Sequence, residues 1–499
     1  MCGIAGYLSL RPETIRESTI RQMTSTLAHR GPDGDGFFTD SFAALGHRRL
    51  SIIDVGGGRQ PMFNEDGNLA IIYNGESYNH ADLRPDLEKA GHCYRSHCDT
   101  ETILHAWEQW GESCVDHFRG MFAFAIWDRT RRSLFCARDR LGIKPFYYFF
   151  NGKTFAFASE IKALIRHPEI SAEFNQNSLP EYLTFGYTSG DETLFHGIRK
   201  LMPGHTLRIS LDRFEPAVRQ YWEMPIDGAS ERARQTETAE ADWIAELRRR
   251  LEETVRLRLM SDVPLGMFLS GGVDSSAIAA IMRGMVDSPV KTFSVGYAER
   301  RYSELEYASS VARRIGTDHH EVVISMDDFF GALPSLIWHE DEPIVWPSSV
   351  SLFFVSRLAS EHVKVVLTGE GSDELFAGYG RYQYQLWNQK WADRWSAVPS
   401  FIRGAVRAAI ASSPLLRADI RPSWVIHFWG APLTFRAFFW TISTAHSLRP
   451  RRPGCSPTGP LRRSSRHTRT TSLFGRRAAI YLLWNGCFTP IARPIWSSS

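Results

Sequence analysis

Apolar residues in the first 222 positions come in short runs separated by turn-forming residues. Runs of this length and spacing are typical of β-strands that are buried on one or both faces. They predict strands at residues 3–10, 42–45, 50–55, 69–73, 121–128, 134–139 and 155–159. We therefore expect the first part of the chain to be rich in sheet.

Two segments of this half show the helical period instead. Residues 15–29 carry apolar side chains at spacings of three and four. Residues 99–110 begin with Asp99, Thr100 and Glu101, a pattern typical of a helix N-terminus. Strands with a few helices predict sheets flanked by helices.

The pattern changes after residues 223–242, a polar segment with few aromatic residues that is the best linker candidate. A long helix is predicted at 244–259. Strands at 263–269, 291–295, 321–324 and 364–368 then alternate with helices up to residue 360. This alternation predicts βαβ units around a parallel sheet, whose ligands bind beyond the carboxyl ends of the strands.

A chain of 499 residues is expected to form two or three domains. Its charged residues are distributed unevenly along the sequence. The last acidic residue is Asp419, and the 80 residues after it carry twelve arginines. The rest of the chain holds 46 basic and 55 acidic residues, so its net charge is −9. A nucleic-acid partner would require a basic face on the folded body, so we do not expect one.

The seven cysteines, at positions 2, 93, 98, 114, 136, 455 and 487, show no pairing. His92-Cys93 and His97-Cys98 have no second pair at zinc spacing. An odd count in a large chain favours reduced thiols. No apolar run reaches the length of about 18 residues that spans a membrane, and the N-terminus lacks a signal-peptide pattern. We therefore expect a cytoplasmic protein without a membrane partner.

Cys2 is the first residue that suggests chemistry. Removal of Met1 would leave Cys2 with a free α-amine, whose ordinary pKa is about 7.7–8.0. Such an amine can accept the proton of a thiol with a pKa of about 8.5 and so activate it for attack on an amide. A cysteine at position 2 is an accident of composition in most chains, so further residues must support this interpretation.

Three groups of residues could complete an amide-cleaving site. Asn74-Gly75 follows an apolar run and offers an amide and a backbone N–H for an oxyanion, although an ordinary Asn-Gly turn has the same sequence. Arg49 could bind a carboxylate in a bidentate manner, and Glu76 or Asp99 could hold an ammonium group. Taken singly, each of these three charged residues is more often an ordinary surface charge.

A second constellation lies between a predicted strand and a predicted helix. Residues 269–276 read LSGGVDSS, in which glycines, hydroxyls and a helix N-terminus together form a phosphate-binding loop. It is not the GxxxxGK[ST] loop, because no lysine follows. Asp274 would repel phosphate unless Mg²⁺ lies between them. Glu370, Asp373 and Glu374 follow another strand, where they are either site residues or solvated loop acids.

Six segments of the first half together resemble the class II glutamine amidotransferase domain, in the order found in asparagine synthetases. They are MCGIAGY (1–7), HRGPDG (29–34), HRRLSIID (47–54), YNGESYN (73–79), CDTE (98–101) and RDRLGIKPFYY (138–148). The resemblance implies an N-terminal nucleophile fold, with stacked antiparallel sheets between helices. It also implies Cys2 as nucleophile, Asn74 and Gly75 as oxyanion hole, and glutamine bound by Arg49, Leu50, Ile53, Asn74, Gly75, Glu76 and Asp99.

The second half resembles the adenine-nucleotide α-hydrolase group through residues 269–276, and asparagine synthetases through GEGSDE at 369–374. The resemblance implies ATP bound by Leu269, Ser270, Gly271, Gly272, Asp274, Ser275, Ser276, Val295, Thr368 and Gly369. It implies that Glu370 supports adenylate formation and ammonia attack, and that Asp274 and Asp373 hold Mg²⁺. As isolated apolar strand residues, Leu269 and Val295 would equally fit a core.

The expected fold class is therefore mixed α/β and α+β, with an αββα sandwich at 2–222, a linker at 223–242 and an ATP-binding parallel-sheet domain at 243–447. The expected reaction converts ATP, aspartate and glutamine to AMP, diphosphate, asparagine and glutamate. Two alternatives share the motifs: a paralogue that amidates another carboxylate, such as a sugar acid in exopolysaccharide assembly, and a glutaminase-only or non-catalytic protein. A homodimer is the base-rate expectation.

The resemblance covers roughly residues 1–380. Residues 440–451 keep a family-like S-x-A-x-S-L core, but Trp440 and Arg449 replace its flanking acids. Residues 448–499 form an atypical tail rich in Arg, Ser and Pro. We hypothesise that this tail reflects a reading-frame change. A chain that carries it as written is expected to have an impaired ligase half.

Overall fold

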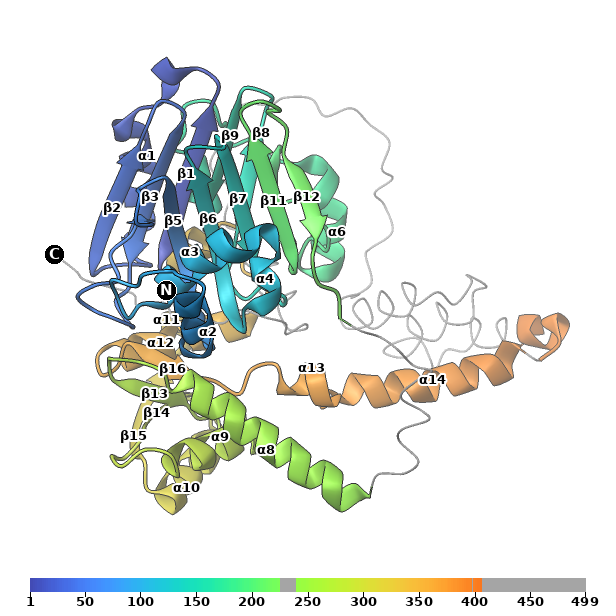
Figure 1. Ribbon diagram of the computed structural model, residues 1–499. Coiled ribbons are helices and arrows are strands. Elements are labelled where there is room, and N and C mark those ends of the chain that lie inside the picture. Colours follow the sequence, from blue (N-terminus) through green and yellow to red (C-terminus); the bar gives the residue numbers. More distant parts are fainter. Residues whose placement is uncertain (225–238, 397, 406–499) are drawn as a thin grey trace.

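The computed structural model describes residues 1–224, 239–396 and 398–405 (Figure 1). The S-x-A-x-S-L segment, the tail and most of the proposed linker lie outside these residues. The described part consists of a sandwich of two antiparallel sheets followed by a domain built on a parallel sheet.

Each sheet of the sandwich has six strands. The first has the order β10-β8-β9-β1-β3-β2 and is formed by β1 (Gly3–Ser9), β2 (Gly34–Thr39), β3 (Ala43–Arg49), β8 (Tyr147–Phe150), β9 (Thr154–Ala158) and β10 (Ile198–Lys200). The second has the order β12-β11-β7-β6-β5-β4 and is formed by β4 (Met62–Phe63), β5 (Leu69–Ser77), β6 (Gly120–Asp128), β7 (Ser133–Arg138), β11 (His205–Ser210) and β12 (Ala217–Gln220).

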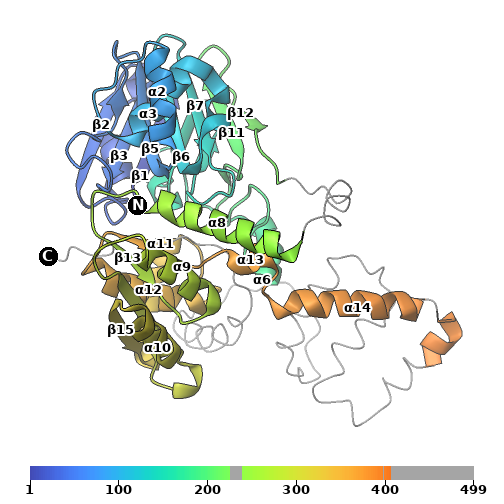
Figure 2. The ribbon, with the colours of Figure 1, turned by 60° about the horizontal axis from the view of Figure 1, so that its bottom comes forward.

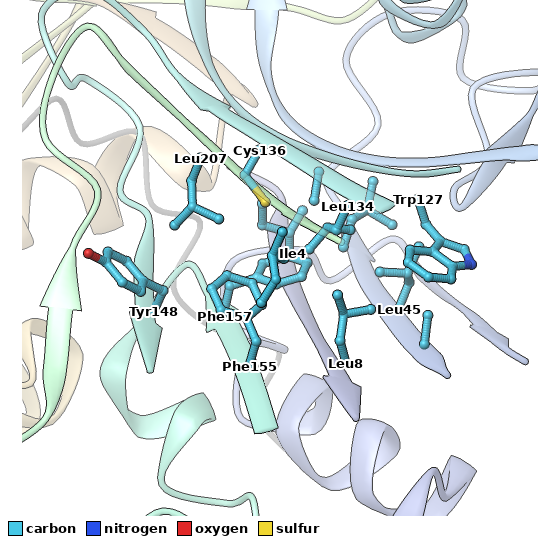
Figure 3. Close-up of a cluster of buried hydrophobic side chains, with 14 of the residues drawn as sticks. Ile4, Leu8, Leu45, Trp127, Leu134, Cys136, Tyr148, Phe155, Phe157 and Leu207 are labelled. Carbon is cyan, nitrogen blue, oxygen red and sulfur yellow. The ribbon is translucent and has the colours of Figure 1, made fainter. Parts of the chain in front are cut away.

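The strands alternate side chains between two apolar environments, because both faces of each sheet are covered. Ile4, Leu8 and Phe157 of the first sheet meet Leu134 and Leu207 of the second in the central core (Figure 3). The outer faces pack on helices, which gives the predicted αββα sandwich. These helices are α1 (Glu17–Ser25) and α5 (Ile161–Leu164) on one side, and α2 (His80–Lys89), α3 (Asp99–Trp110) and α4 (Cys114–His117) on the other.

Short elements complete this domain: η1 (Pro12–Thr14), η2 (Gly111–Ser113), η3 (Gln176–Ser178) and α6 (Leu179–Phe185). The strand predicted at 50–55 is wrong, because these residues form a loop. The Arg49 guanidinium binds the carbonyls of Ile53, Asp54 and Val55, which turns the chain away from the sheet. Alternating apolar residues in this loop imitate a strand, although Ile52 and Ile53 line a cavity.

The second domain has a four-stranded parallel sheet in the order β15-β14-β13-β16. Its strands are β13 (Leu265–Phe268), β14 (Lys291–Tyr297), β15 (Asp318–Ile324) and β16 (Val365–Leu367). The helices are α8 (Glu240–Arg258), η4 (Arg300–Tyr302), α9 (Val273–Arg283), α10 (Leu305–Ile315), α11 (Met326–Glu340), α12 (Pro347–Ser360), α13 (Ser372–Phe376) and α14 (Gly380–Ser396). This confirms the predicted parallel sheet.

Helices cover both faces of the parallel sheet. Residues of α8, α9 and α10 form one apolar cluster with β13 and β16, and residues of α11 and α12 pack on the other face. Strands β14 and β16 both pair with β13, so the strand order reverses at β13. A parallel sheet binds its ligands at such a reversal, and the loop that follows β13 contains the predicted phosphate-binding residues.

The two domains make direct contacts, and α8 runs between them (Figure 2). The Lys162 ammonium of the sandwich lies 2.9 Å from the Asp341 carboxylate of the second domain, and both side chains are buried. Asp262 N donates to Ile52 O over 3.0 Å.

None of the helices within the described ranges combines the length and apolar character that a membrane crossing requires. The five described cysteines are free thiols.

Candidate active sites

Cys2 lies at the start of β1, at the edge of the sandwich that faces the second domain. Its Sγ accepts a hydrogen bond from Leu50 N over 3.4 Å, and its backbone oxygen accepts one from Arg30 Nε over 2.9 Å. Arg30 is fully buried and continues to Glu160 over 2.8 Å. The chain at Cys2 is therefore held by an ion pair beneath it and by the loop that follows β3.

Burial sets the protonation of this chain end. It lowers the pKa of the Met1 amine to about 4, against a weaker opposing effect of the Cys2 thiolate. It raises the pKa of the Cys2 thiol, while the neighbouring amine opposes that rise. The amine with this low pKa belongs to Met1. Removal of Met1 would place the α-amine on Cys2 itself, beside the thiol from which a general base has to accept a proton.

Asn74 has a buried side-chain amide that lacks hydrogen-bond partners in the described sandwich. It lies on β5, is 1% exposed, and neither its Nδ2 nor its Oδ1 has a hydrogen-bond partner. A buried amide without partners is costly unless a ligand completes it. Gly75 follows it, and a Cβ there would lie 2.3 Å from Met121 O, so only glycine fits between β5 and β6. Both predicted oxyanion donors thus lie together.

Asp99 and Glu76 lie in the same cavity as Cys2. Burial raises the pKa of Asp99, although Ser77 N and the Tyr73 hydroxyl donate to its Oδ2 over 2.9 and 3.0 Å. Burial also raises the pKa of Glu76, and Lys144 opposes that rise. A buried carboxylate with a raised pKa gains stability from a cation, so this pair suits the α-ammonium of an amino acid.

Arg49, Leu50 and Ile53 also line this cavity, as predicted for glutamine ligands. The Arg49 guanidinium donates three hydrogen bonds to loop carbonyls, so it holds the loop in place in addition to lining the cavity.

The sequence did not point to Arg30 and Lys144 as residues of this site. Both lie within the family-like segments at 29–34 and 138–148, but only the tertiary structure shows that they are buried beside Cys2 and Glu76.

The loop between β13 and α9 has the form that a phosphate site requires. Gly271 has a φ of +81°, and a Cβ there would lie 2.6 Å from the α10 backbone. Ser270 Oγ lies 3.0 Å from Ser275 Oγ and accepts from Gly272 N over 3.3 Å. Ser276 Oγ is buried without a partner, which leaves a donor for an anion.

The turn after β16 lies against this loop. A Cβ on Gly369 would lie 3.1 Å from Ser275 N, so glycine is needed for the approach. Burial raises the pKa of Glu370, and Glu374 and Asp373 raise it further. Asp274 is exposed and Asp373 half-buried. The fold therefore brings the segments around Thr368–Asp373 and Ser270–Ser276 together from positions about 100 residues apart.

Leu269 and Val295 differ from the other predicted ATP residues. The Leu269 side chain is 1% exposed and belongs to the apolar cluster beneath α8 and α9. Val295 packs against the clusters beneath α11 and α12. Their side chains form core, so an adenosine contact there would involve the backbone at the strand ends.

A cavity of about 1170 Å³ is lined by residues of both domains. Cys2, Asn74, Glu76 and Asp99 line it from the sandwich, and Thr368 and Glu370 line it from the second domain. Apolar residues of α8 and β16, which include Leu251, Val255 and Leu367, also line it. The Ser270–Ser276 loop does not line it.

Comparisons with known proteins agree with this division. Residues 1–222 match the glutamine amidotransferase domain family and residues 246–474 match the asparagine synthase family. Asparagine synthetase [glutamine-hydrolyzing] 1 of Bacillus subtilis is 38% identical over 389 residues, which cover 77% of this chain and 60% of that protein. A Methanocaldococcus jannaschii protein of the same family name is 36% identical over 401 residues, 76% of each chain.

The Amidase chyE of Penicillium rubens is 31% identical over 417 residues, 77% of this chain and 60% of that protein. The chain spans about three fifths of the length of the first Bacillus and Mycobacterium relatives. The two family matches, the identity over most of the chain and the paired sites lead to one conclusion: this chain belongs to the glutamine-hydrolysing asparagine synthetase family.

Proposed function

We propose that the chain is a glutamine-dependent asparagine synthetase, which converts ATP, L-aspartate, L-glutamine and water to AMP, diphosphate, L-asparagine and L-glutamate. The observation that carries the proposal is the cavity that extends from Cys2 to Glu370. A glutaminase alone has no use for such a path, whereas ammonia released at Cys2 has to reach an activated carboxylate without being protonated in bulk water.

In the first half-reaction, the Cys2 amine accepts the thiol proton and the sulfur attacks the glutamine side-chain amide. Asn74 Nδ2 and Gly75 N donate to the oxygen that becomes negative, in a site where Asn74 has no competing partner. Ammonia leaves with the proton, and water hydrolyses the thioester to glutamate. Asp99 and Glu76 hold the α-ammonium group, and Arg49 faces the carboxylate.

In the second half-reaction, the aspartate side-chain carboxylate attacks the α-phosphorus of ATP and diphosphate leaves. Ammonia then attacks the acyl-adenylate, AMP leaves, and the amide forms. The backbone of Gly271 and Gly272 and the free Ser276 hydroxyl suit the diphosphate. Asp274 and Asp373 would hold Mg²⁺, which neutralises phosphate charge when bound. Glu370, with its raised pKa, can take the proton that the attacking ammonia releases.

The test is an incubation with glutamine carrying ¹⁵N in its amide, ATP, Mg²⁺ and aspartate, in a buffer that contains unlabelled ammonium. Mass spectrometry should find AMP in an amount equal to the total asparagine, and the asparagine should carry more ¹⁵N than the free ammonium in the buffer. Glutamate without AMP or asparagine would contradict the proposal and leave only a glutaminase. AMP formation that requires another carboxylate would point to a different acceptor.

Cys2→Ala provides the matched control. It should abolish the transfer of ¹⁵N from glutamine while unlabelled asparagine still forms from ammonium, because the second site remains whole. Loss of both reactions in a folded variant would show that Cys2 does not act only as the glutaminase nucleophile.

A further inference from the structure

A second group of imidazole and carboxylate side chains lies in the sandwich, outside the cavity lining. Glu65 in the turn between β4 and β5, His92 in the connection from α2 to α3, and His105 on α3 each offer a ligand atom within 4.8 Å of the others. The sequence separates them by 27 and 13 residues, so no local zinc-like spacing reveals them. The tertiary fold alone brings them together.

A fourth donor adjoins these three. Glu108 Oε2 lies 2.9 Å from His105 Nδ1 and 3.6 Å from His92 Nδ1, and His105 Nδ1 lies 4.0 Å from Glu65 Oε1. His105 is 1% exposed, whereas the Glu65 side chain is about one third exposed and His92 half-buried. The group thus combines a fixed buried ring with two donors on connecting segments that can adjust.

A carboxylate lies on the far side of the His105 ring. The Nε2 atom of this ring lies 3.8 Å from Glu101 Oε1 and makes no hydrogen bond in the described residues. Glu101 is held by the backbone N–H groups of Arg95 and Ser96, each over 2.7 Å. A carboxylate on this side is the usual partner of the second nitrogen of a metal-bound imidazole, so a small approach of the His105 ring would complete that contact.

We propose that Glu65, His92, His105 and Glu108 bind one divalent transition-metal ion of the zinc type. Two imidazoles and two carboxylates suit a tetrahedral zinc ion, and the imidazoles disfavour Mg²⁺ and Ca²⁺. Bond lengths of about 2.0–2.2 Å place tetrahedral donors roughly 3.4 Å from one another, so Glu65 has to approach His105, and Glu108 has to move slightly away from it.

The ion would join three segments that otherwise meet only through side-chain contacts. The connection that carries His92 continues directly to Cys98 and Asp99, which line the cavity beside Cys2. A metal that ties this connection to α3 and to the β4–β5 turn would therefore stabilise the wall that holds Asp99. We expect zinc to raise the thermal midpoint of the protein.

The experiment uses the full chain after metal removal, in excess Mg²⁺, with zinc binding followed by a competing chromophoric chelator. The wild type should bind one zinc more than His92→Gln, whose affinity at this site should fall at least about 100-fold. His196→Gln, an exposed histidine of the same domain, is the matched control and should behave as the wild type. Glu65→Gln provides a second variant at an exposed position.

Co²⁺ distinguishes this site from cysteine sites. The visible spectrum of the bound Co²⁺ should lack the thiolate charge-transfer band that binding at Cys2 or Cys93 would produce. Equal zinc stoichiometry in the wild type and His92→Gln, or a zinc-dependent rise in thermal midpoint that His92→Gln retains, would overturn the proposal and leave the group as an ion-paired cluster.

Discussion

At the scale of single residues, the candidate glutaminase site is defined by groups that burial leaves unsatisfied or wrongly charged. The Asn74 side-chain amide has no hydrogen-bond partner, and Asp99 and Glu76 have raised pKa values. Each of these costs free energy in the empty protein. A bound glutamine would relieve these costs together.

Asn74→Ala should lower kcat for glutamine hydrolysis by about 10²–10³-fold, because an oxyanion donor contributes mainly in the transition state. KM for glutamine should change little. Steady-state assay of glutamate release measures both. Asn68→Ala, on the same hairpin but with a side chain that donates to Asp66 within the turn, should keep wild-type kinetics. A rise in KM at constant kcat would assign Asn74 to ground-state binding instead.

The buried His47 side chain should make the free energy of unfolding depend on pH. It is fully buried, and burial lowers its pKa to about 3, while its Nε2 lies 3.1 Å from Tyr73 O. Between pH 6.5 and about 3 the unfolded chain binds a proton that the folded protein does not, so the free energy of unfolding falls as pH falls, by about 1.4 kcal/mol per unit. Above pH 6.5 this contribution is constant.

Denaturant unfolding at pH 7 and pH 5 measures this effect. His47→Gln keeps a donor toward Tyr73 O and removes the titrating group. Between pH 7 and pH 5, the free energy of unfolding of this variant should therefore fall by about 2 kcal/mol less than that of the wild type. Equal losses in the two proteins would show that His47 becomes protonated without unfolding.

At the scale of elements, the loop after β3 illustrates how local pattern and tertiary structure diverge. Its residues alternate as a strand does, yet Arg49 draws the carbonyls of residues 53–55 into a turn. A guanidinium offers several donors in one plane, and an ammonium does not. The helices and most strands followed their sequence periods because their apolar faces match the layers that bury them.

Arg49→Lys should raise KM for glutamine by roughly tenfold, since a lysine cannot hold three carbonyls and the loop that carries Leu50 and Ile53 loosens. kcat should fall less. Arg48→Lys, whose side chain reaches Asp35 at the surface over 3.4 Å, is the neighbouring control. An unchanged KM in Arg49→Lys would mean that the charge alone matters at this position.

At the scale of the whole molecule, the interface links the nucleophile to the second domain. Arg30 bonds Cys2 O and Glu160, Glu160 bonds Lys162, and Lys162 reaches Asp341 in the second domain. These side chains are buried, and a buried charge without a partner of opposite sign is costly. The charged groups are therefore held next to one another. The chain of ion pairs extends from the backbone at Cys2, a residue that lines the cavity, to the second domain.

Asp341→Asn should weaken the coupling between the two reactions. Breaking a buried pair costs roughly 3 kcal/mol, so the interface should open and ammonia should escape. Glutamate formed per AMP should rise above one, as measured by mass spectrometry. Arg119→Gln removes an exposed pair with Glu253 across the same interface and should keep the ratio at one. A constant ratio in Asp341→Asn would show that this network does not seal the cavity.

The sequence by itself determined the two-domain order, the αββα sandwich, the parallel sheet and the family, because periodicity and short motifs are local properties. It also singled out Cys2, Asn74, Gly75 and Asp99, which line one cavity in the structure. Only the tertiary structure decided the loop at 50–55, the core role of Leu269 and the buried partners Arg30 and Lys144. It alone formed the continuous cavity and the Glu65–His92–His105 group. These depend on contacts between distant segments, which no local spacing encodes.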